Sequence, residues 1–334
     1  MTLARDVMPA RAQVGRVWSA ADVLALAQEQ VASGRSVTAA PMGTGFTPLD
    51  DHLGGGLRPG ELALLGGAQG LGKTMLALQM ARNMVAAGGH ATFVCYEHDV
   101  EQLLERLIAL ESGEVGGREA PGLDAVRGSL SAVPDGTGLY ERLGVHGQSA
   151  MAAIASYGDR LQLVRASGSR TGSRELYEIA STATGLLVVD YLQKVHAGGR
   201  GVDEDERVTH VVEALKDLAL DLGRPVLAVV ASDKSGLSGR TRLRDLRGST
   251  ALAYEADVAL MLNDKYDVVA RNHLMYGGSE VERFHDWVVC SIEKNRNGVA
   301  GGDLEFEKDF GHGRFEPDGR VVLEMLANER LGLD

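Results

Sequence analysis

The stretch Leu64–Asn83, LLGGAQGLGKTMLALQMARN, joins an apolar run to a helix-like run through two glycine-rich turns. Its centre, GAQGLGKT from Gly67 to Thr74, satisfies the pattern GxxxxGK[ST] directly after a predicted strand and before a predicted helix. Gly67, Gly70 and Gly72 allow successive backbone N–H groups to curl round a phosphate, and the helix adds the positive end of its dipole. The stretch is therefore predicted to bind the phosphates of ATP.

Two side chains of the same stretch complete this phosphate site. Lys73 is placed to meet the outer phosphates, and the Thr74 hydroxyl can ligate Mg²⁺. Hydrolysis also needs one carboxylate for the metal and another to activate water. Asp190 ends the apolar run LLVVD and suits the metal shell, whereas Glu97 ends TFVCYE and suits the general base. An alternative for Glu97 is a helix-start acid that favours the dipole of a helix from Asp99 onward.

Short apolar runs alternate with amphipathic ones along most of the chain. The amphipathic stretch EDERVTHVVEALKDLALDLG places its valines and leucines on one helical face, and Gly223 then ends the helix. Most apolar runs lack alternation, as expected for strands that are buried on both faces. The chain is therefore predicted to form an α/β domain with a mostly parallel central sheet flanked by helices. The predicted strands are Glu61–Gly67, Ala91–Glu97, Arg160–Val164, Gly185–Tyr191, Pro225–Ala231, Asp257–Leu262 and Trp287–Glu293.

Composition limits the classes of protein to consider. The chain has 334 residues, of which 44% are hydrophobic and 24% charged, values that are ordinary for a soluble globular protein. Because it shows neither an apolar run of about 18 residues nor the apolar core of a secretion signal, we expect a cytoplasmic protein without a membrane partner. Cys95 and Cys290 each lie in an apolar run, which predicts buried thiols. The net charge of −12 disfavours non-specific adhesion to nucleic acid, so any such binding requires a local basic patch.

Several motifs together resemble the C-terminal ATPase domain of the DnaB-type replicative helicases, within the larger RecA-like group of P-loop NTPases. They follow the family's order from Thr44 to Glu316, and the pair DYLQ and KNRNG is far more specific than the phosphate-binding pattern. The motifs are TGFTPLDDHLGGGLRPGEL before the glycine-rich turns, GLGKTMLALQMA within them, DYLQ at 190–193, DLRGS at 245–249, EADV at 255–258 and EKNRNG at 293–298.

The resemblance implies a ring, usually of six identical subunits, that hydrolyses ATP at subunit interfaces and moves along single-stranded DNA. It also implies that Lys294 and Arg296 of the KNRNG turn reach the ATP of the next subunit. A guanidinium supplied across an interface would stabilise charge on the transferred phosphoryl group and make hydrolysis depend on assembly. The alternative for this stretch is a β-turn with solvated charges.

The same resemblance places DNA on loops that line a central channel, and Lys234 to Arg247 is the candidate loop. It carries five basic residues and one acidic residue, a local excess of positive charge in an acidic chain. Arg240, Arg242 and Arg244 alternate, so an extended loop would point them one way toward phosphates, and Lys234 is a further candidate for contact with nucleic acid. No aromatic residue lies in the loop, so base stacking is not predicted there. A merely solvated loop is the alternative.

The predicted organisation has four parts. Residues 1–17 form a flexible arm, and 18–42 form a linker with a helix that is capped by Ser19 and ends at Gly34. The resemblance implies that this linker docks on a neighbouring subunit. Residues 43–320 form the RecA-like ATPase domain, and 321–334 form a tail. Within the domain, the glycine-rich segment 113–149 is interpreted as a surface insertion.

Two departures from the family that the chain resembles leave alternative functions open. Ala231 stands where relatives carry a glutamine that is thought to sense the terminal phosphate, and only about 40 residues precede the ATPase region. The favoured hypothesis is an ATP-driven helicase or single-stranded DNA translocase. The rival hypothesis is a RecA/KaiC-like ATPase that acts as a switch or scaffold through assembly. A monomeric nucleotide-binding protein is disfavoured by the predicted trans-acting pair.

Overall fold

The fold is built on one large, mostly parallel sheet. The structure is a computed structural model that describes residues 17–131, 137–196, 203–232, 239–270, 273–274 and 281–327. The ten strands follow the order β10-β8-β7-β6-β1-β5-β4-β2-β3, with β9 paired to β8. The strands are β1 Leu62–Gly67, β2 Ala91–Cys95, β3 Leu161–Arg165, β4 Leu186–Asp190, β5 Val226–Ala231, β6 Val258–Asp264, β7 Trp287–Asn295, β8 Asp303–Asp309, β9 Arg314–Phe315 and β10 Arg320–Val321.

The first six strands run parallel, and the C-terminal strands run antiparallel at one edge. All seven predicted strands are present, which confirms the predicted α/β domain with a mostly parallel sheet. Strands β8 to β10 were not predicted. The central strands β1, β2 and β4 are buried along their whole length, as their unbroken apolar runs require.

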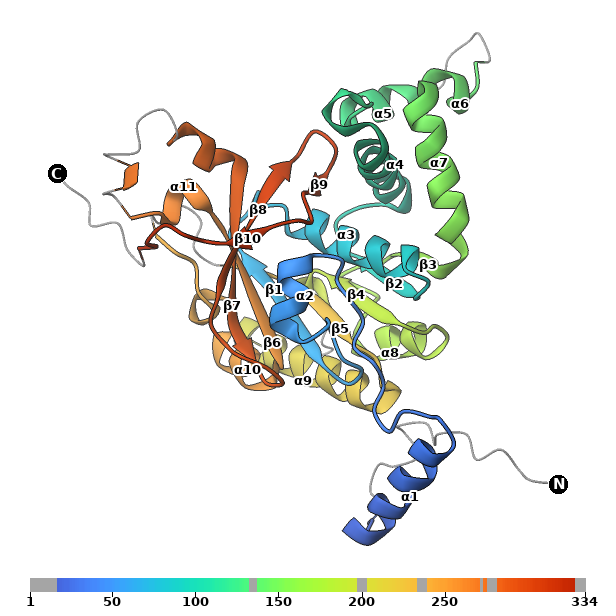
Figure 1. Cartoon of the computed structure of the whole chain (residues 1–334), viewed down its shortest axis with the longest axis vertical. Helices are drawn as coiled ribbons and strands as arrows, with labels where there is room; N and C mark the ends of the chain where they lie inside the picture. The colour runs from blue at the N-terminus through green and yellow to red at the C-terminus, as the bar shows by residue number, and fades with distance from the viewer. Residues whose placement is uncertain are drawn as a thin grey trace.

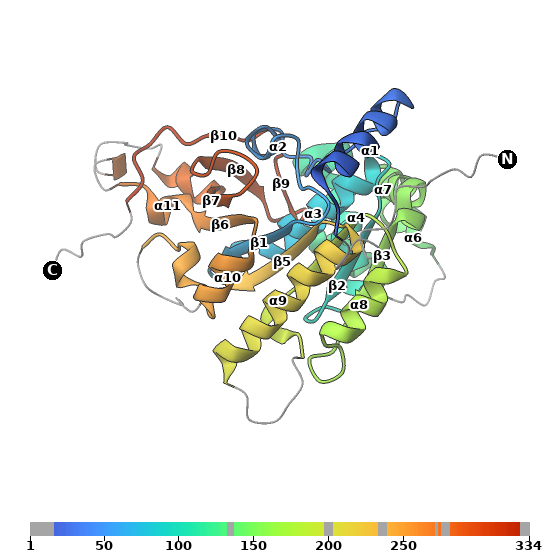
Figure 2. The same ribbon diagram turned by 90° about the horizontal axis from the view of Figure 1, so that it is seen from below.

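Helices cover both faces of the sheet (Figures 1 and 2). One hydrophobic core joins one sheet face to α2, α3, α4 and the end of α7. A second core joins the opposite face to α8, α9 and α10. The helices are α1 Ala20–Ala32, α2 Thr47–Leu53, α3 Lys73–Ala86, α4 Val100–Gly116, α5 Leu123–Leu130, α6 Leu139–Arg142, α7 Gly144–Tyr157, α8 Ser173–Ser181, α9 Glu204–Leu222, α10 Ser249–Glu255 and α11 Lys265–Val268.

The two helices predicted from capping and periodicity are present. Helix α1 begins after Ser19, which forms a capping box with Asp22. Helix α9 ends at Gly223, which adopts the left-handed conformation with φ 58° and ψ 43°. Figure 1 shows α1 projecting from the body of the protein near the described N-terminus, so α1 has little contact with its own domain.

The segment predicted as a surface insertion is helical where it is described. Helices α5, α6 and α7 pack over α4 around a small core of their own, formed by Ile108, Ala109, Val126, Leu143 and Ala150. The many glycines and turn residues dilute the helical period in the sequence, which explains why the helices were not predicted.

The C-terminal part of the chain contributes to the fold. Strand β10 pairs with β8, and Leu326 forms a bridge with Val269. The described part of the predicted tail therefore lies against the ATPase domain. The predicted arm, apart from Val17, lies outside the described residues.

Candidate active site

The glycine-rich turns connect the end of β1 to the start of α3. Gly70 and Gly72 both adopt φ of 82°, a conformation that other residues reach only with strain. Gly72 is also constrained by space, since a Cβ atom there would lie 2.7 Å from the Phe315 ring. The two glycines thus allow the backbone to wrap closely around the N-terminus of α3, where a phosphate is favoured.

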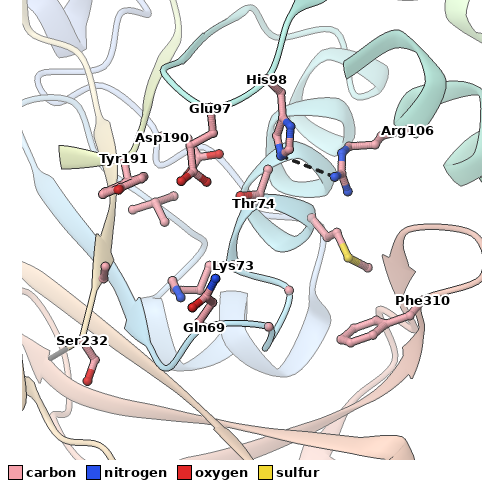
Figure 3. Close-up of a pocket in the computed structure, with 15 residues that line it drawn as sticks. Gln69, Lys73, Thr74, Glu97, His98, Arg106, Asp190, Tyr191, Ser232 and Phe310 are labelled. Atoms are coloured by element: carbon pink, nitrogen blue, oxygen red, sulfur yellow. Dashed lines mark hydrogen bonds between the residues drawn. The ribbon is translucent and has the colours of Figure 1, made fainter. Parts of the chain in front are cut away.

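Lys73, the first residue of α3, extends back across this turn. Its Nζ donates to the carbonyls of Gly67 at 2.9 Å and Ala68 at 2.7 Å. Burial lowers the pKa of Lys73, and the nearby carboxylates of Asp190 and Glu97 oppose that shift. The side chain lines a pocket of about 520 Å³, together with residues of the glycine-rich turn (Figure 3).

Asp190 and Glu97 line the same pocket, from the C-terminal ends of neighbouring strands. Asp190 ends β4 and pairs in register with Cys95, and Glu97 follows two residues later in the chain. Asp190 is 1% exposed. Burial raises the pKa of Asp190 to about 6; a hydrogen bond from the Thr74 hydroxyl opposes the shift and the Glu97 charge adds to it. The structure therefore brings together Lys73, Thr74, Glu97 and Asp190 as predicted.

The surroundings of Glu97 favour the pocket over a capping role. Helix α4 begins at Val100, and its cap is Asp99, which forms a capping box with Gln102. The helix-start function is therefore already supplied by Asp99, and Glu97 instead faces the pocket (Figure 3). A carboxylate at this edge of the sheet can accept a proton from an attacking water.

The donor set fits Mg²⁺ together with a nucleotide triphosphate. Mg²⁺ keeps several waters and takes only one or two protein ligands, and the Thr74 hydroxyl and the Asp190 carboxylate supply such a pair. A bound cation would favour the ionised form of Asp190. Among the described residues no group of three or more His, Cys, Asp and Glu side chains could hold a metal ion by itself.

Several pocket residues were not predicted from the sequence. His98 and Arg106 face each other, with 3.4 Å between His98 Nε2 and Arg106 Nη2. The pKa of His98 is lowered first by burial and then by the Arg106 charge. Phe310 enters from the hairpin of β8 and β9. His98 directly follows Glu97 in the sequence, so its place near the pocket could have been predicted from that neighbour. No local sequence pattern predicts that Arg106 or Phe310 lines the pocket.

The pocket lies at the C-terminal ends of the parallel strands, and Lys294 and Arg296 lie toward the opposite ends of these strands. Asn295 pairs with Val258, the first residue of β6, whereas Gly67 pairs with Leu262 near the last. These two points of β6 are four residues apart, or roughly 13 Å along the sheet at about 3.3 Å per residue. The pair therefore does not complete the pocket of its own chain.

Contacts within the chain hold both cations near the end of α10. Lys294 Nζ donates to the carbonyl of Ala253 at 2.7 Å, and Arg296 Nη1 pairs with Asp257 at 3.0 Å. The Arg296 guanidinium also donates to the Tyr254 carbonyl at 2.5 Å. Arg296 is still about half exposed, so its guanidinium is accessible from outside the chain.

The predicted geometry of the basic loop is wrong for Arg240. This side chain is 8% exposed and donates to the Ser291 hydroxyl and the Asp303 carboxylate. Residues Leu243–Asp245 form a 3-10 turn, so the arginines do not alternate along an extended chain. Arg242 pairs with Glu293, whereas Arg244 is exposed.

Lys234 lies outside the described residues. Arg240 is thus buried and paired within the fold, whereas Arg244 has the exposure that a phosphate contact requires.

Ala231, where a sensing glutamine was expected, is held by a different glutamine. The Gln193 amide accepts from Ala231 N at 3.1 Å and donates to Ala231 O at 3.0 Å. These two hydrogen bonds join the DYLQ motif to the end of β5. Ala231 and Ser232 both line the pocket.

Comparison with known proteins gives a consistent result. A model of the DnaB-like helicase C terminal domain family matches residues 41–316. The replicative DNA helicase DnaB of Treponema pallidum (strain Nichols) is 28% identical over 277 residues, covering 80% of this chain and 54% of that protein. The replicative DNA helicase DnaC of Bacillus subtilis (strain 168) is 27% identical over 279 residues, covering 80% and 55%. The chain thus spans about half the length of the relatives that it matches.

Solved structures show the same fold. One of them, an isolated ATPase domain, superposes with a TM-score of 0.67 at 19% identity, covering 90% of this chain and 99% of that one. A DnaB-like replicative helicase, solved to study its interactions with primase, gives a TM-score of 0.68 at 19% identity, covering 89% and 68%. These similarities confirm the predicted RecA-like architecture. No helix in the described ranges has the length and apolar character needed to cross a bilayer.

Proposed function

The chain belongs to the DnaB-like helicase C-terminal domain family, and from this membership we propose that it is an ATP-hydrolysing DNA helicase or single-stranded DNA translocase. We further propose that it works in the cytoplasm as a homo-oligomeric ring, usually a hexamer, with ATP bound at the subunit interfaces. The observation that carries the proposal is that the two groups of site residues lie toward opposite ends of the strands of one sheet. Lys73, Glu97 and Asp190 share a pocket, whereas Lys294 and Arg296 lie toward the opposite end of β6.

The chain's own residues suit hydrolysis of ATP. The backbone amides of the glycine-rich turns and Lys73 would hold the outer phosphates, and Thr74 and Asp190 would hold Mg²⁺. Mg²⁺, when bound, neutralises negative charge on the phosphates. Glu97 accepts the proton of the attacking water. Arg296 and Lys294 of the adjacent subunit stabilise the charge that develops on the terminal phosphoryl group.

Helix α1 supports assembly into a ring. Its side chains Val23, Leu24 and Val31 are exposed, although a helix usually buries its apolar residues. Because α1 has little contact with its own domain, we propose that the linker 18–42 docks on the ATPase domain 43–320 of a neighbouring subunit.

One assay with forked DNA tests the proposed function. The purified chain is expected to displace the labelled strand of a fork when ATP and Mg²⁺ are present, and not when a non-hydrolysable ATP analogue replaces ATP. Displacement would be followed by gel or by fluorescence. ATP turnover that is stimulated by single-stranded DNA but yields no displacement would favour a translocase. Turnover that does not respond to DNA would contradict both and favour the assembly-switch alternative.

Binding to single-stranded DNA is expected to depend on the exposed end of the basic loop. We propose that Arg244 contacts DNA phosphates, with Lys234 and Arg242 as further candidates. Arg244→Ala is expected to weaken binding and to reduce the slope of log K against log salt by about 0.7 for one lost phosphate contact. The slope would be measured by fluorescence anisotropy at several salt concentrations.

A matched control removes the same charge elsewhere. Arg174 lies on the surface of α8 and pairs only weakly, as an exposed pair with Glu178. Arg174→Ala is expected to leave the salt slope unchanged. An equal slope for Arg244→Ala and the parent protein would remove Arg244 from the DNA site and favour the solvated-loop alternative.

A further inference from the structure

Asp257, the residue before β6, is a buried carboxylate that contacts two cations. It is only 5% exposed. Its Oδ2 atom accepts from Lys216 Nζ at 2.7 Å, and its Oδ1 atom accepts from Arg296 Nη1 at 3.0 Å. Because an ionised carboxylate is rarely buried without opposite charge, these two pairs explain how Asp257 is accommodated in the interior. Asp257 thus links a mostly buried lysine to the half-exposed Arg296.

The surroundings of Asp257 hold the carboxylate in place. Its Oδ2 atom also accepts from Leu62 N at 2.8 Å, and its own N–H donates to the Leu62 carbonyl at 2.8 Å. Leu62 begins β1, which is buried along its whole length. Lys216 of α9 donates in addition to the Gly60 carbonyl at 2.9 Å. The position of the carboxylate is therefore fixed by β1 and α9, without any contribution from Arg296.

The KNRNG turn, which carries Arg296, is also attached to the body of the domain. Asn295 Nδ2 donates to the His52 carbonyl at 3.0 Å. Asn297 Nδ2 donates to the carboxylate of Glu61 at 2.5 Å, and Glu61 is itself buried. Since these contacts fix the backbone on both sides of Arg296, the remaining freedom lies in its long side chain.

The contacts of the Arg296 side chain reduce this freedom but leave the guanidinium accessible. Asp257 engages Nη1 and the Tyr254 carbonyl engages Nη2, yet the side chain is 47% exposed. Holding a flexible side chain in one conformation beforehand lowers the entropy that is lost when it binds. If the guanidinium shifts toward a phosphate, Lys216 still compensates the buried charge of Asp257. Arg296 is therefore ordered at the surface without being indispensable to the interior.

We propose that Asp257 is a positioning residue, which holds the Arg296 guanidinium where it can reach the terminal phosphate of the ATP in the neighbouring subunit. Lys216 supports this role, because it anchors the same carboxylate. The inference rests on the proposed trans-acting role of Arg296. It makes the buried Asp257 important for hydrolysis in the neighbouring subunit, on which Asp257 acts only through Arg296.

Asp257→Asn tests this role, because the amide keeps the size of the side chain and removes its charge. The variant is expected to lower kcat for ATP hydrolysis about 10²-fold, a loss typical of a small misplacement, and to leave KM near that of the parent protein. Glu111→Gln is the matched control, because the Glu111 side chain is 1% exposed and pairs with Arg82 at 2.5 Å. The control should hydrolyse ATP like the parent protein. Thermal unfolding compares the stability of the two variants.

Mixed rings separate a positioning role from a structural one. Asp257→Asn keeps its own pocket, so a Lys73→Ala neighbour, which supplies an intact arginine, should restore turnover at up to about a quarter of the interfaces. Asp257→Asn mixed with Arg296→Ala should give no recovery, because neither chain supplies a positioned arginine. A tag on one variant confirms by co-purification that the rings are mixed.

Two outcomes would overturn the proposal. A kcat of Asp257→Asn equal to that of the parent protein would show that Arg296 needs no support from Asp257. If Asp257→Asn failed to recover with Lys73→Ala, although Arg296→Ala did recover with it, Asp257 would instead support the fold or the pocket of its own chain. Neither outcome bears on the proposed function, whose trans-acting site fails separately if Lys73→Ala and Arg296→Ala do not complement each other.

Discussion

Lys73→Ala is expected to abolish ATP turnover, with a loss of at least about 10²–10³-fold. Its ammonium is held at the glycine-rich turn by the carbonyls of Gly67 and Ala68, where it can reach the outer phosphates. Removing it also leaves the charge of Asp190 and Glu97 less compensated. Steady-state phosphate release measures turnover, and equilibrium binding of a fluorescent nucleotide shows whether ATP affinity falls as well.

Glu97→Gln is expected to give a different phenotype, which separates binding from chemistry. The amide keeps the shape of the side chain but cannot accept a proton, so ATP binding remains while hydrolysis falls by about 10²–10⁴-fold. Glu101→Gln is the matched control, because Glu101 is an exposed acid in the first turn of α4. The control should hydrolyse ATP like the parent protein. If Glu97→Gln did so too, Glu97 would lose its assignment as general base.

The phosphate site could be predicted from the sequence because its residues follow strand ends. Lys73 and Thr74 begin α3, after the short turn that follows β1, and Asp190 and Glu97 come at or just after the ends of β4 and β2. The C-terminal ends of parallel strands meet at one edge of a sheet, so order along the chain is enough to bring these residues together. This part of the prediction needed no tertiary contact.

Other parts depended on contacts that no local pattern shows. Arg240 was expected to face DNA, but its partners Ser291 and Asp303 come from strands β7 and β8, far along the chain. Strand β8 was missed because its sequence is rich in charge. One of its acids, Glu305, is 1% exposed and pairs with Lys265, which is equally buried. A buried ion pair makes a core strand read as a surface segment.

Mixing Lys73→Ala and Arg296→Ala subunits is expected to restore part of the ATPase that each variant lacks. Loss of a trans-acting arginine costs about 10³–10⁵-fold in turnover, so each variant alone should be nearly inactive. In a mixed ring, an Arg296→Ala subunit offers an intact pocket, and a Lys73→Ala neighbour offers an intact arginine. At equal random mixing about a quarter of the interfaces combine the two, if subunits act independently.

The position of Arg296 gives this experiment its physical basis. Arg296 is tied to Asp257 at the edge of the sheet that lies opposite Gly67, so it cannot serve the pocket of its own chain without a large rearrangement. An arginine that did act within its own chain would give no recovery, because every subunit would then carry one broken half of its site.

Proof of mixed rings decides how a negative result is interpreted. A tag on one variant should co-purify the other, since subunits that fail to exchange would mimic a lack of recovery. Arg174→Ala mixed with Lys73→Ala serves as a reference, because Arg174→Ala keeps both the pocket and Arg296. Titrating small amounts of Lys73→Ala into the parent protein then shows whether one inactive site stops the whole ring. Mixed rings without recovery, in a ring whose sites work independently, would contradict the trans-acting role of Arg296 and leave it as a residue that holds the KNRNG turn on Asp257.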